Sequence, residues 1–233
     1  MRVPRGLRPA LTRRVVALGT LAALLASCNE PPAPPARPGV VLEIDGIVVE
    51  EHELEPLLDY IRQSGDRIGR AAAVRAVLDR HVLPLRFAQR EFAAQRAELA
   101  ERATAFRRSV EASGNADPQL RSKGAILGGE PSGGLIGRSA MELAQAAWCF
   151  VEENLGQVSP VIEVPRGFCV MSVADYQPGL ERSGDLVDAY QVPFYTHDKR
   201  AFSAWWDERK RALAGKLTWV NPEYADALPT WLR

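Results

Sequence analysis

The hydrophobic residues of this chain follow two patterns, short β-rich runs typical of strands and the three-to-four-residue spacing of helices. The first β-rich run begins at Val40. Residues 40–44 and 47–49 are rich in β-branched side chains, as strands are. The Asp45-Gly46 dipeptide between them favours a two-residue turn. Together these residues predict a β-hairpin.

Helical spacing follows the hairpin. Apolar residues recur every three or four positions over residues 54–61, and this stripe ends at Ser64-Gly65. A second stripe runs over residues 74–110 and predicts a long helical arm. A bend is expected at Pro84, because proline cannot donate a backbone hydrogen bond. His81 lies on the apolar side of the arm and is interpreted as a core histidine.

The pattern changes after the arm. Residues 113–137 are rich in glycine and predict loop or short strand, and they lack the Gly-Lys-Ser/Thr ending of a phosphate loop. Helical spacing returns over residues 141–150. Two strand-like runs then flank Pro165-Arg166-Gly167, the second over residues 168–173.

The N-terminus predicts export with a lipid anchor. Residues 2–14 contain five arginines and no acid, and the apolar stretch 15–25 is too short to span a bilayer. The site Leu25-Ala26-Ser27-Cys28 follows directly, as bacterial lipoprotein processing requires. We expect Cys28 to carry the lipid; the alternative is an ordinary cleaved signal peptide with an incidental cysteine.

Composition narrows the partners of the exported part. Cleavage removes five of 29 basic residues and leaves 24 against 29 acidic ones, a net charge of −5, so nucleic acid is not an expected partner. Five prolines between Glu30 and Gly39 predict an extended tether over residues 28–39. Cys149 and Cys169 lie where oxidation is permitted and can form a disulfide; the alternative is two small buried apolar residues.

Four segments resemble the second half of a parvulin-type prolyl isomerase domain. The family has a glycine-rich turn, a helix of the form Phe-x-x-Ala-x-Phe, a Gly-Glu-Val-Ser-x-Pro-Val strand and a Gly-Tyr-His-Ile-Ile strand. The corresponding segments here are Gly134-Leu135-Ile136-Gly137, residues 143–148, Gly156-Gln157-Val158-Ser159-Pro160-Val161 and Gly167-Phe168-Cys169-Val170-Met171.

The flanking segments resemble SurA-type and PrsA-type extracytoplasmic foldases, in which a similar hairpin precedes a helical chaperone module. Residues 201–220 resemble the closing helix and strand of SurA, which implies that residues 217–220 pair with the hairpin. The expected fold is α+β: a helical chaperone-like module closed by N- and C-terminal strands, with a small parvulin-like α/β insert. The expected divisions are a signal peptide (1–27), the tether (28–39), the helical module (40–114 plus 198–233), the parvulin-like domain (115–180) and a connector (181–197).

The parvulin resemblance implies a proline or peptide pocket, and the departures from the family bear on its activity. Cys169 stands where the family has a pocket histidine, and the opening strand with the other histidine has no counterpart between Gly114 and Gly133. A thiol is a weaker hydrogen-bond partner than imidazole, so we expect binding without isomerase turnover. The pocket residues expected from the resemblance are Leu135, Met141, Leu143, Phe168 and Cys169.

The leading expectation is therefore a lipid-anchored chaperone for unfolded or extended exported polypeptides, at the periplasmic face of the outer membrane. Two alternatives stay open: an active prolyl isomerase with a rebuilt pocket, and a non-catalytic scaffold in an envelope or export assembly. No catalytic residue is assigned and no cofactor is expected. The three histidines, His52, His81 and His197, lack zinc-ligand spacing, so no metal site is expected either.

Overall fold

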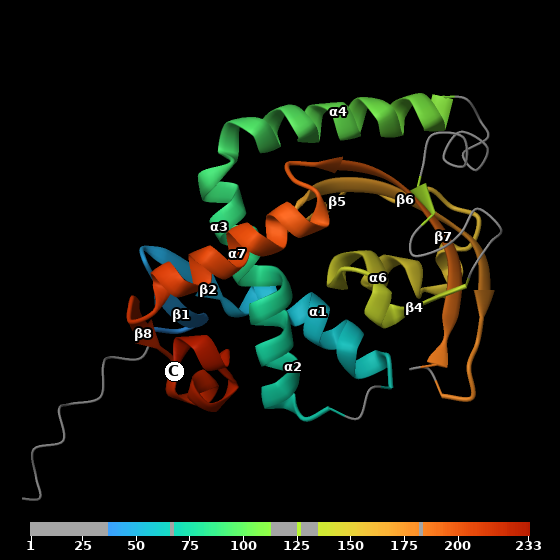
Figure 1. Cartoon of the computed structure of the whole chain (residues 1–233). Coiled ribbons are helices and arrows are strands. Elements are labelled where there is room, and N and C mark those ends of the chain that lie inside the picture. The colour runs from blue at the N-terminus through green and yellow to red at the C-terminus, as the bar shows by residue number, and fades with distance from the viewer. Residues whose placement is uncertain (1–36, 66–67, 113–124, 127–134, 182–183) are drawn as a thin grey trace, which may run out of the picture. The chain divides into compact units, whose positions relative to one another are not determined.

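The computed structural model describes residues 37–65, 68–112, 125–126, 135–181 and 184–233. These residues form a mixed α+β structure with antiparallel sheets, which confirms the expected α+β class (Figure 1). The helices are α1 (Glu51–Gln63), α2 (Arg70–Val77), α3 (Leu83–Glu91), α4 (Ala93–Ala112), α6 (Leu143–Cys149) and α7 (Lys199–Leu213). The strands are β1 (Val40–Ile44), β2 (Ile47–Glu50), β3 (Ala125–Ile126), β4 (Ile136–Gly137), β5 (Ile162–Val164), β6 (Gly167–Gln177), β7 (Leu186–Tyr195) and β8 (Leu217–Val220).

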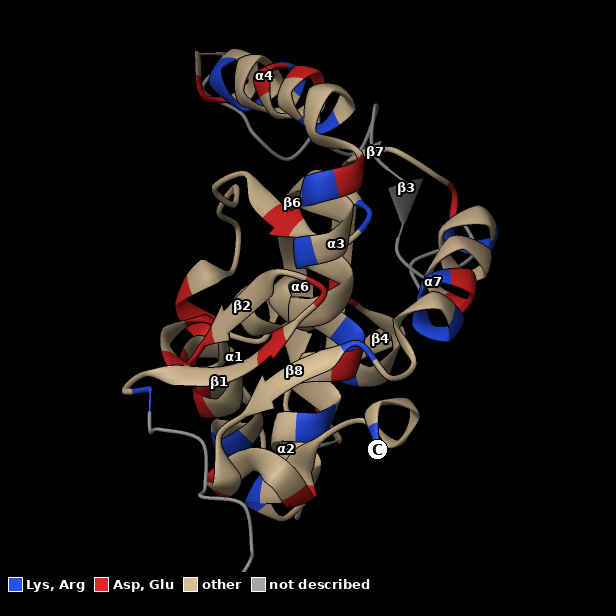
Figure 2. Ribbon diagram, turned by 90° about the vertical axis from the view of Figure 1, so that its left-hand side faces the viewer, with Lys and Arg blue, Asp and Glu red and all other residues tan. Residues whose placement is uncertain are grey.

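Both ends of the described chain build one small sheet, in the order β2-β1-β8 (Figure 2). Asp45 and Gly46 turn the chain between β1 and β2 with φ of 49° and 76°, the positive values that a two-residue hairpin turn requires. On the other edge of β1, Leu42 pairs with Val220 of β8. The predicted hairpin and its pairing with residues 217–220 are both confirmed.

Helices cover this sheet and form the larger hydrophobic core, which we call the helical core. Helix α1 contributes Leu54, Leu57 and Ile61, and α7 contributes one apolar face. Trp206 of α7 packs against Phe87 of α3, with ring centroids 6.1 Å apart. The last turn-like segments of the chain close the same core with Tyr224, Ala227, Leu228 and Leu232.

The predicted helical arm is broken in two places. A π-helical turn, Leu78–Val82, separates α2 from α3 just before Pro84, whose missing N–H leaves the carbonyl of Arg80 without its usual donor. The sharper bend lies at Phe92, with φ −110° and ψ 25°, where α3 ends and α4 turns away (Figure 1). The bend expected at Pro84 is therefore a local widening of the helix, and the change of direction comes eight residues later.

The second sheet has the order β3-β7-β6-β5, with β4 also paired to β7. Strand β6 presents alternate residues to two helices. Cys169, Met171 and Val173 face α6 and form the sheet core with Ala146 and Cys149, whereas Val170 packs with Val110 of α4. Residues 181–197, which were expected to be a connector, contain the ten-residue strand β7, and β7 pairs with β6 along its whole length.

Arg96 fastens α4 to the edge of the second sheet. Its guanidinium donates to a carboxylate oxygen of Glu163 on β5 at 2.8 Å, and to the carbonyls of Pro165 and Val164 at 2.8 and 3.1 Å. The Arg96 side chain is 4% exposed, whereas that of Glu163 is 39% exposed, so the guanidinium is shielded from water and the carboxylate is only partly so. Gln89 of α3 donates to the same carboxylate, which ties the arm on both sides of its bend to β5.

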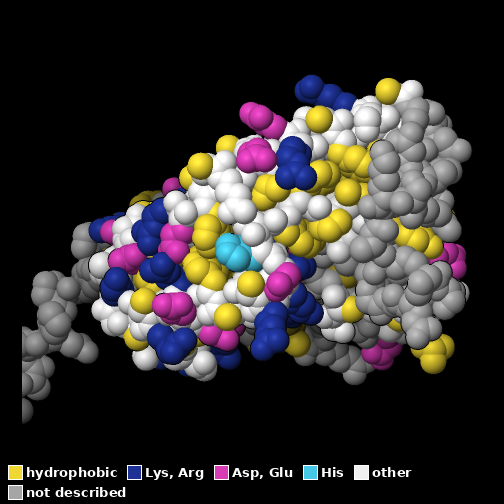
Figure 3. Space-filling view, turned by 45° about the horizontal axis from the view of Figure 1, so that its top comes forward, with side chains coloured by type: hydrophobic (Ala, Val, Ile, Leu, Met, Phe, Trp, Pro, Cys, Tyr) yellow, Lys and Arg dark blue, Asp and Glu magenta, His cyan; other side chains and the backbone are white. Residues whose placement is uncertain are grey.

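Two features of the described residues bear on membranes and nucleic acid. Within those ranges, no helix combines the length and apolar character needed to cross a bilayer. On the face in Figure 3, basic and acidic side chains are interspersed over the described surface, without the basic stripe that nucleic-acid-binding proteins present.

Candidate functional site

The five pocket residues expected from the sequence do not meet in one place. Phe168 and Cys169 are neighbours on β6, so their side chains point to opposite faces of the sheet. The Arg96 guanidinium lies 5.1 Å from the centre of the Phe168 ring, on the α4 side. Cys169 points to α6 and is fully buried. The assignment of both residues to one pocket is therefore wrong.

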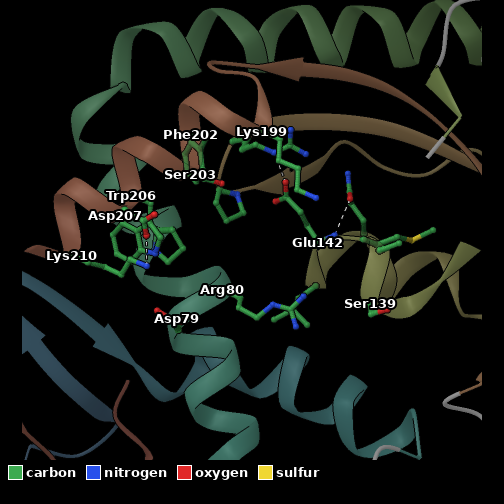
Figure 4. A pocket seen from close by; sticks show the side chains of 17 residues that line it. Asp79, Arg80, Ser139, Glu142, Lys199, Phe202, Ser203, Trp206, Asp207 and Lys210 are labelled. Carbon is green, nitrogen blue, oxygen red and sulfur yellow. Dashed lines mark hydrogen bonds and ion pairs between the residues drawn. The ribbon is translucent and has the colours of Figure 1, made fainter. Parts of the chain in front are cut away.

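Met141 and Leu143 do line a common cavity, a cleft of about 430 Å³ between the helical core and the sheet core. Leu143 packs in the helical core and Met141 in the sheet core, so the segment that starts α6 joins the two. Leu135, just before β4, does not line the cleft. The cleft is lined by Asp79, Arg80, Pro84, Ser139, Ala140, Met141, Glu142, Leu143, Gln145, Pro165, Arg166, Lys199, Phe202, Ser203, Trp206, Asp207 and Lys210 (Figure 4).

The innermost polar group of the cleft, Gln145, is committed to a buried hydrogen-bond cluster. Its amide nitrogen lies 2.9 Å from the side-chain oxygen of Gln191, 3.0 Å from the Tyr195 hydroxyl and 3.4 Å from the Cys169 sulfur. Its oxygen accepts from the backbone N–H of Glu142, which closes a capping box at the start of α6. An amide has two N–H donors, so this cluster uses all of them.

Burial determines the protonation states of Cys169 and Tyr195 in this cluster. Burial raises the pKa of the Cys169 thiol to about 12, and burial likewise raises the pKa of Tyr195. Both groups are therefore protonated at neutral pH, and Cys169 is not a thiolate nucleophile. This agrees with the absence of a histidine within hydrogen-bonding contact of Cys169 among the described residues.

The Cys149–Cys169 disulfide considered from the sequence is not present. Both residues are buried free thiols. Cys149 lies against Met171, with 3.9 Å between the two sulfur atoms, and Cys169 accepts a hydrogen bond from Gln145. The two cysteines act as small core residues, the alternative that the sequence left open.

On the sheet side of the cleft, an ion pair joins the β5–β6 turn to the start of α6. The Arg166 Nε donates to Glu142 at 2.6 Å, and the guanidinium stacks 4.2 Å from the centre of the Tyr195 ring. Arg166 belongs to the β5–β6 turn and Glu142 precedes α6, so the pair positions the helix over the turn. Such a charge-assisted bond with a stacked guanidinium is among the stronger polar contacts available.

The remaining charged groups of the cleft come from the π-helical turn and from α7. Asp207 pairs with Lys210 at 2.6 Å, and Asp79 accepts from the indole N–H of Trp231 at 2.8 Å. Arg80 and Lys199 have no ion-pair partner within the described ranges (Figure 4). Sequence reasoning did not single out Arg80; Pro84, four residues later, was the available signal of an irregular helix there.

The histidines lie apart from the cleft. His197 packs against Phe92 in a tilted arrangement with ring centroids 4.8 Å apart, and His52 is exposed beside Glu50. His81 is buried in the helical arm, as expected from the apolar stripe. In the described part of the chain, no group of histidine, cysteine and acidic residues is arranged to hold a metal ion.

Comparison with known proteins found no matching family model, no matching curated protein and no matching solved structure. The function is therefore inferred from the sequence and from the cleft. Cys28, the expected lipid site, and the cleavage site before it lie outside the described residues.

Proposed function

We propose that this protein is a lipid-anchored foldase-like chaperone that binds unfolded exported polypeptides and does not catalyse prolyl isomerisation. The observation that carries the proposal is the open cleft between the helical core and the sheet core. It lies between the segments that resemble a SurA-type helical module and those that resemble a parvulin domain. A client segment bound there would contact both.

The lining of the cleft suits an extended polypeptide. Its floor is formed by edges of buried apolar residues, Pro84, Leu143, Phe202 and Trp206 among them, and its rim is charged. An apolar floor with a polar rim binds side chains without demanding one sequence, because apolar contact is not directional. A volume of about 430 Å³ accommodates a few residues of a chain rather than a folded domain.

The same geometry argues against turnover. An isomerase of the parvulin type holds the twisted X-Pro amide with polar groups of its pocket. The residue at the histidine position, Cys169, is 0% exposed and cannot touch a bound peptide. Gln145, the nearest buried amide, has its hydrogens in use. A barrier of about 18–20 kcal/mol would therefore remain nearly unchanged.

A filled cleft tests the chaperone proposal. Ser203 of α7 is exposed and lines the cleft, so Ser203→Trp places an indole in the binding space. If that indole removes contacts worth about 1.4 kcal/mol, the protein concentration needed for half-suppression of aggregation rises about ten-fold. Light scattering of a chemically denatured substrate protein measures this concentration.

The neighbouring residue supplies the control. Ala204 is exposed on the same helix but does not line the cleft, so Ala204→Trp adds the same side chain outside the binding space and should suppress aggregation like the wild type. Equal activity of both variants would remove the cleft from the function. In a tetrapeptide assay we expect the uncatalysed X-Pro isomerisation rate; acceleration lost in Ser203→Trp would instead support the isomerase.

The anchor is tested separately. Cys28→Ala should move the protein from the membrane to the soluble fraction, because lipid attachment needs the thiol of that residue. Asn29 is not the aspartate that retains many proteobacterial lipoproteins in the inner membrane, so we expect wild-type protein in the outer-membrane fraction. Cys149→Ala is the matched control and should leave the distribution unchanged. Membrane association of Cys28→Ala at the wild-type level would contradict the lipid anchor.

A further inference from the structure

In the part of the chain that the structure describes, the acidic side chains of the cleft each have a hydrogen-bond or ion-pair partner, whereas two of its basic side chains do not. Glu142 is held by Arg166 and Asp207 by Lys210, each at 2.6 Å. Asp79 receives the indole N–H of Trp231. On the basic side, Arg80 and Lys199 lack an ion-pair partner within the described ranges. Among the described residues, Arg80 and Lys199 are therefore the charged side chains of the cleft without a side-chain partner.

Arg80 lines both the cleft and a second cavity beside it, and we call these two cavities together the groove. A second hollow of about 220 Å³ lies beside the cleft and shares three of its residues, Arg80, Ser139 and Leu143. The acid of that hollow, Asp185, is already bound by Arg138 at 2.8 Å and by the Tyr176 hydroxyl at 2.6 Å. A chain running from the cleft into the hollow would thus pass Arg80 without meeting a free carboxylate in the hollow.

The local backbone directs Arg80 to this position. It lies within the π-helical turn, whose neighbours Leu78 and Val82 are buried in the helical core. In Figure 4 its side chain extends across the cleft towards α6, away from Asp79, and Lys199 enters from α7 on the opposite wall. A single π-turn changes which residue of a helix faces a given neighbour, and such turns are frequent at functional sites.

We infer that the groove selects extended client segments in which an acidic side chain is flanked by apolar ones, with the carboxylate at Arg80 and the apolar side chains in the cleft and the adjoining hollow. This inference rests on the proposed function. Selection would come from charge complementarity with a solvated guanidinium, which changes affinity by a factor of about two to five.

Peptide titration tests the selection. The full chain is held in uncharged phosphatidylcholine nanodiscs and titrated by calorimetry with three decapeptides of alternating leucine and serine. They differ only in one central residue: glutamate, glutamine or lysine. We expect the glutamate peptide to bind about two- to five-fold more tightly than the glutamine peptide at low salt, and the lysine peptide most weakly. The preference should shrink at high salt, because exposed ion pairs are screened.

Variants assign the preference to Arg80. Arg80→Gln should abolish the difference in affinity between the glutamate peptide and the glutamine peptide. Arg108→Gln is the control, because Arg108 is an exposed cation of α4 that lines neither cavity. Equal binding of all three peptides by the wild type, or a glutamate preference that survives Arg80→Gln, would overturn the selection and leave the chaperone proposal standing. Binding of no peptide would overturn both.

Discussion

A chain that ends at Gly215 is expected to lose cooperative folding of its helical core. The deletion removes β8, the only described strand on that edge of β1, and the buried side chains of Tyr224, Leu228 and Leu232. Each large side chain contributes about 1.5–3 kcal/mol by burial, so their loss amounts to roughly 5 kcal/mol or more. That is comparable with the whole stability of a typical domain, about 5–15 kcal/mol.

Urea denaturation followed by circular dichroism measures the effect, and removal of Arg233 alone is the control. Arg233 is exposed, so the shorter deletion should leave the midpoint within the usual range of surface changes. A chain ending at Gly215 with the midpoint of the intact protein would show that the two termini do not stabilise a common core. The exposed edge of β1 should also increase aggregation of the truncated chain.

Local patterns predicted the elements whose causes are local. The Asp45-Gly46 turn specified the hairpin because few other dipeptides adopt two positive φ angles at low cost. The start of α6 and the strands beside Pro165-Arg166-Gly167 were likewise readable from spacing. The closing strand β8 was predicted from the apolar run after Gly215 together with the resemblance to the SurA order of elements, and Gly215, with φ of 76°, does end α7.

Strand β7 was missed for a physical reason. Pro193 lies inside it, and a proline argues against a strand paired on both sides. Among the described residues, β3 pairs with β7 at Tyr190 and Gln191, and Pro193 lies opposite Cys169 of β6. The long partnership of β6 and β7 could not be read from the residues of either strand alone.

The candidate site was predicted only in part, because it depends on contacts between distant segments. Met141 and Leu143 line the cleft, whereas strand alternation places Phe168 and Cys169 on opposite faces of β6. The wall that Arg80 and α7 contribute to the cleft could not be predicted from the sequence, because these segments meet only in the folded chain. The bend at Phe92 could not be predicted either, because the apolar spacing continues through it. The hydrogen bond from Arg96 to Glu163 holds α4 in its new direction.

Acid is expected to destabilise the protein through His81. Burial lowers the pKa of His81 from 6.5 to about 4, and this effect outweighs the opposing effect of the Glu163 charge. In the unfolded chain the imidazole takes up a proton near pH 6.5, whereas in the folded chain it does so only near pH 4. Stability from this residue is therefore complete above pH 6.5, falls as the pH is lowered through this window, and is lost below pH 4, a change of about 3 kcal/mol.

His81→Leu should remove this part of the acid sensitivity. The Nδ1 atom of His81 is buried without a hydrogen-bond partner among the described residues, so leucine at this position should cost little at pH 7 and can even stabilise. Urea denaturation between pH 7 and pH 4 measures the free energy of unfolding at each pH. Over this range, His81→Leu should lose about 3 kcal/mol less than the wild type. His52→Leu, which replaces an exposed histidine of α1, should keep most of the wild-type slope. If His81→Leu lost stability with acid as steeply as the wild type, burial of the neutral imidazole would not be the cause, and the acid response would belong to the carboxylates that hold Arg96, Arg138 and Arg166.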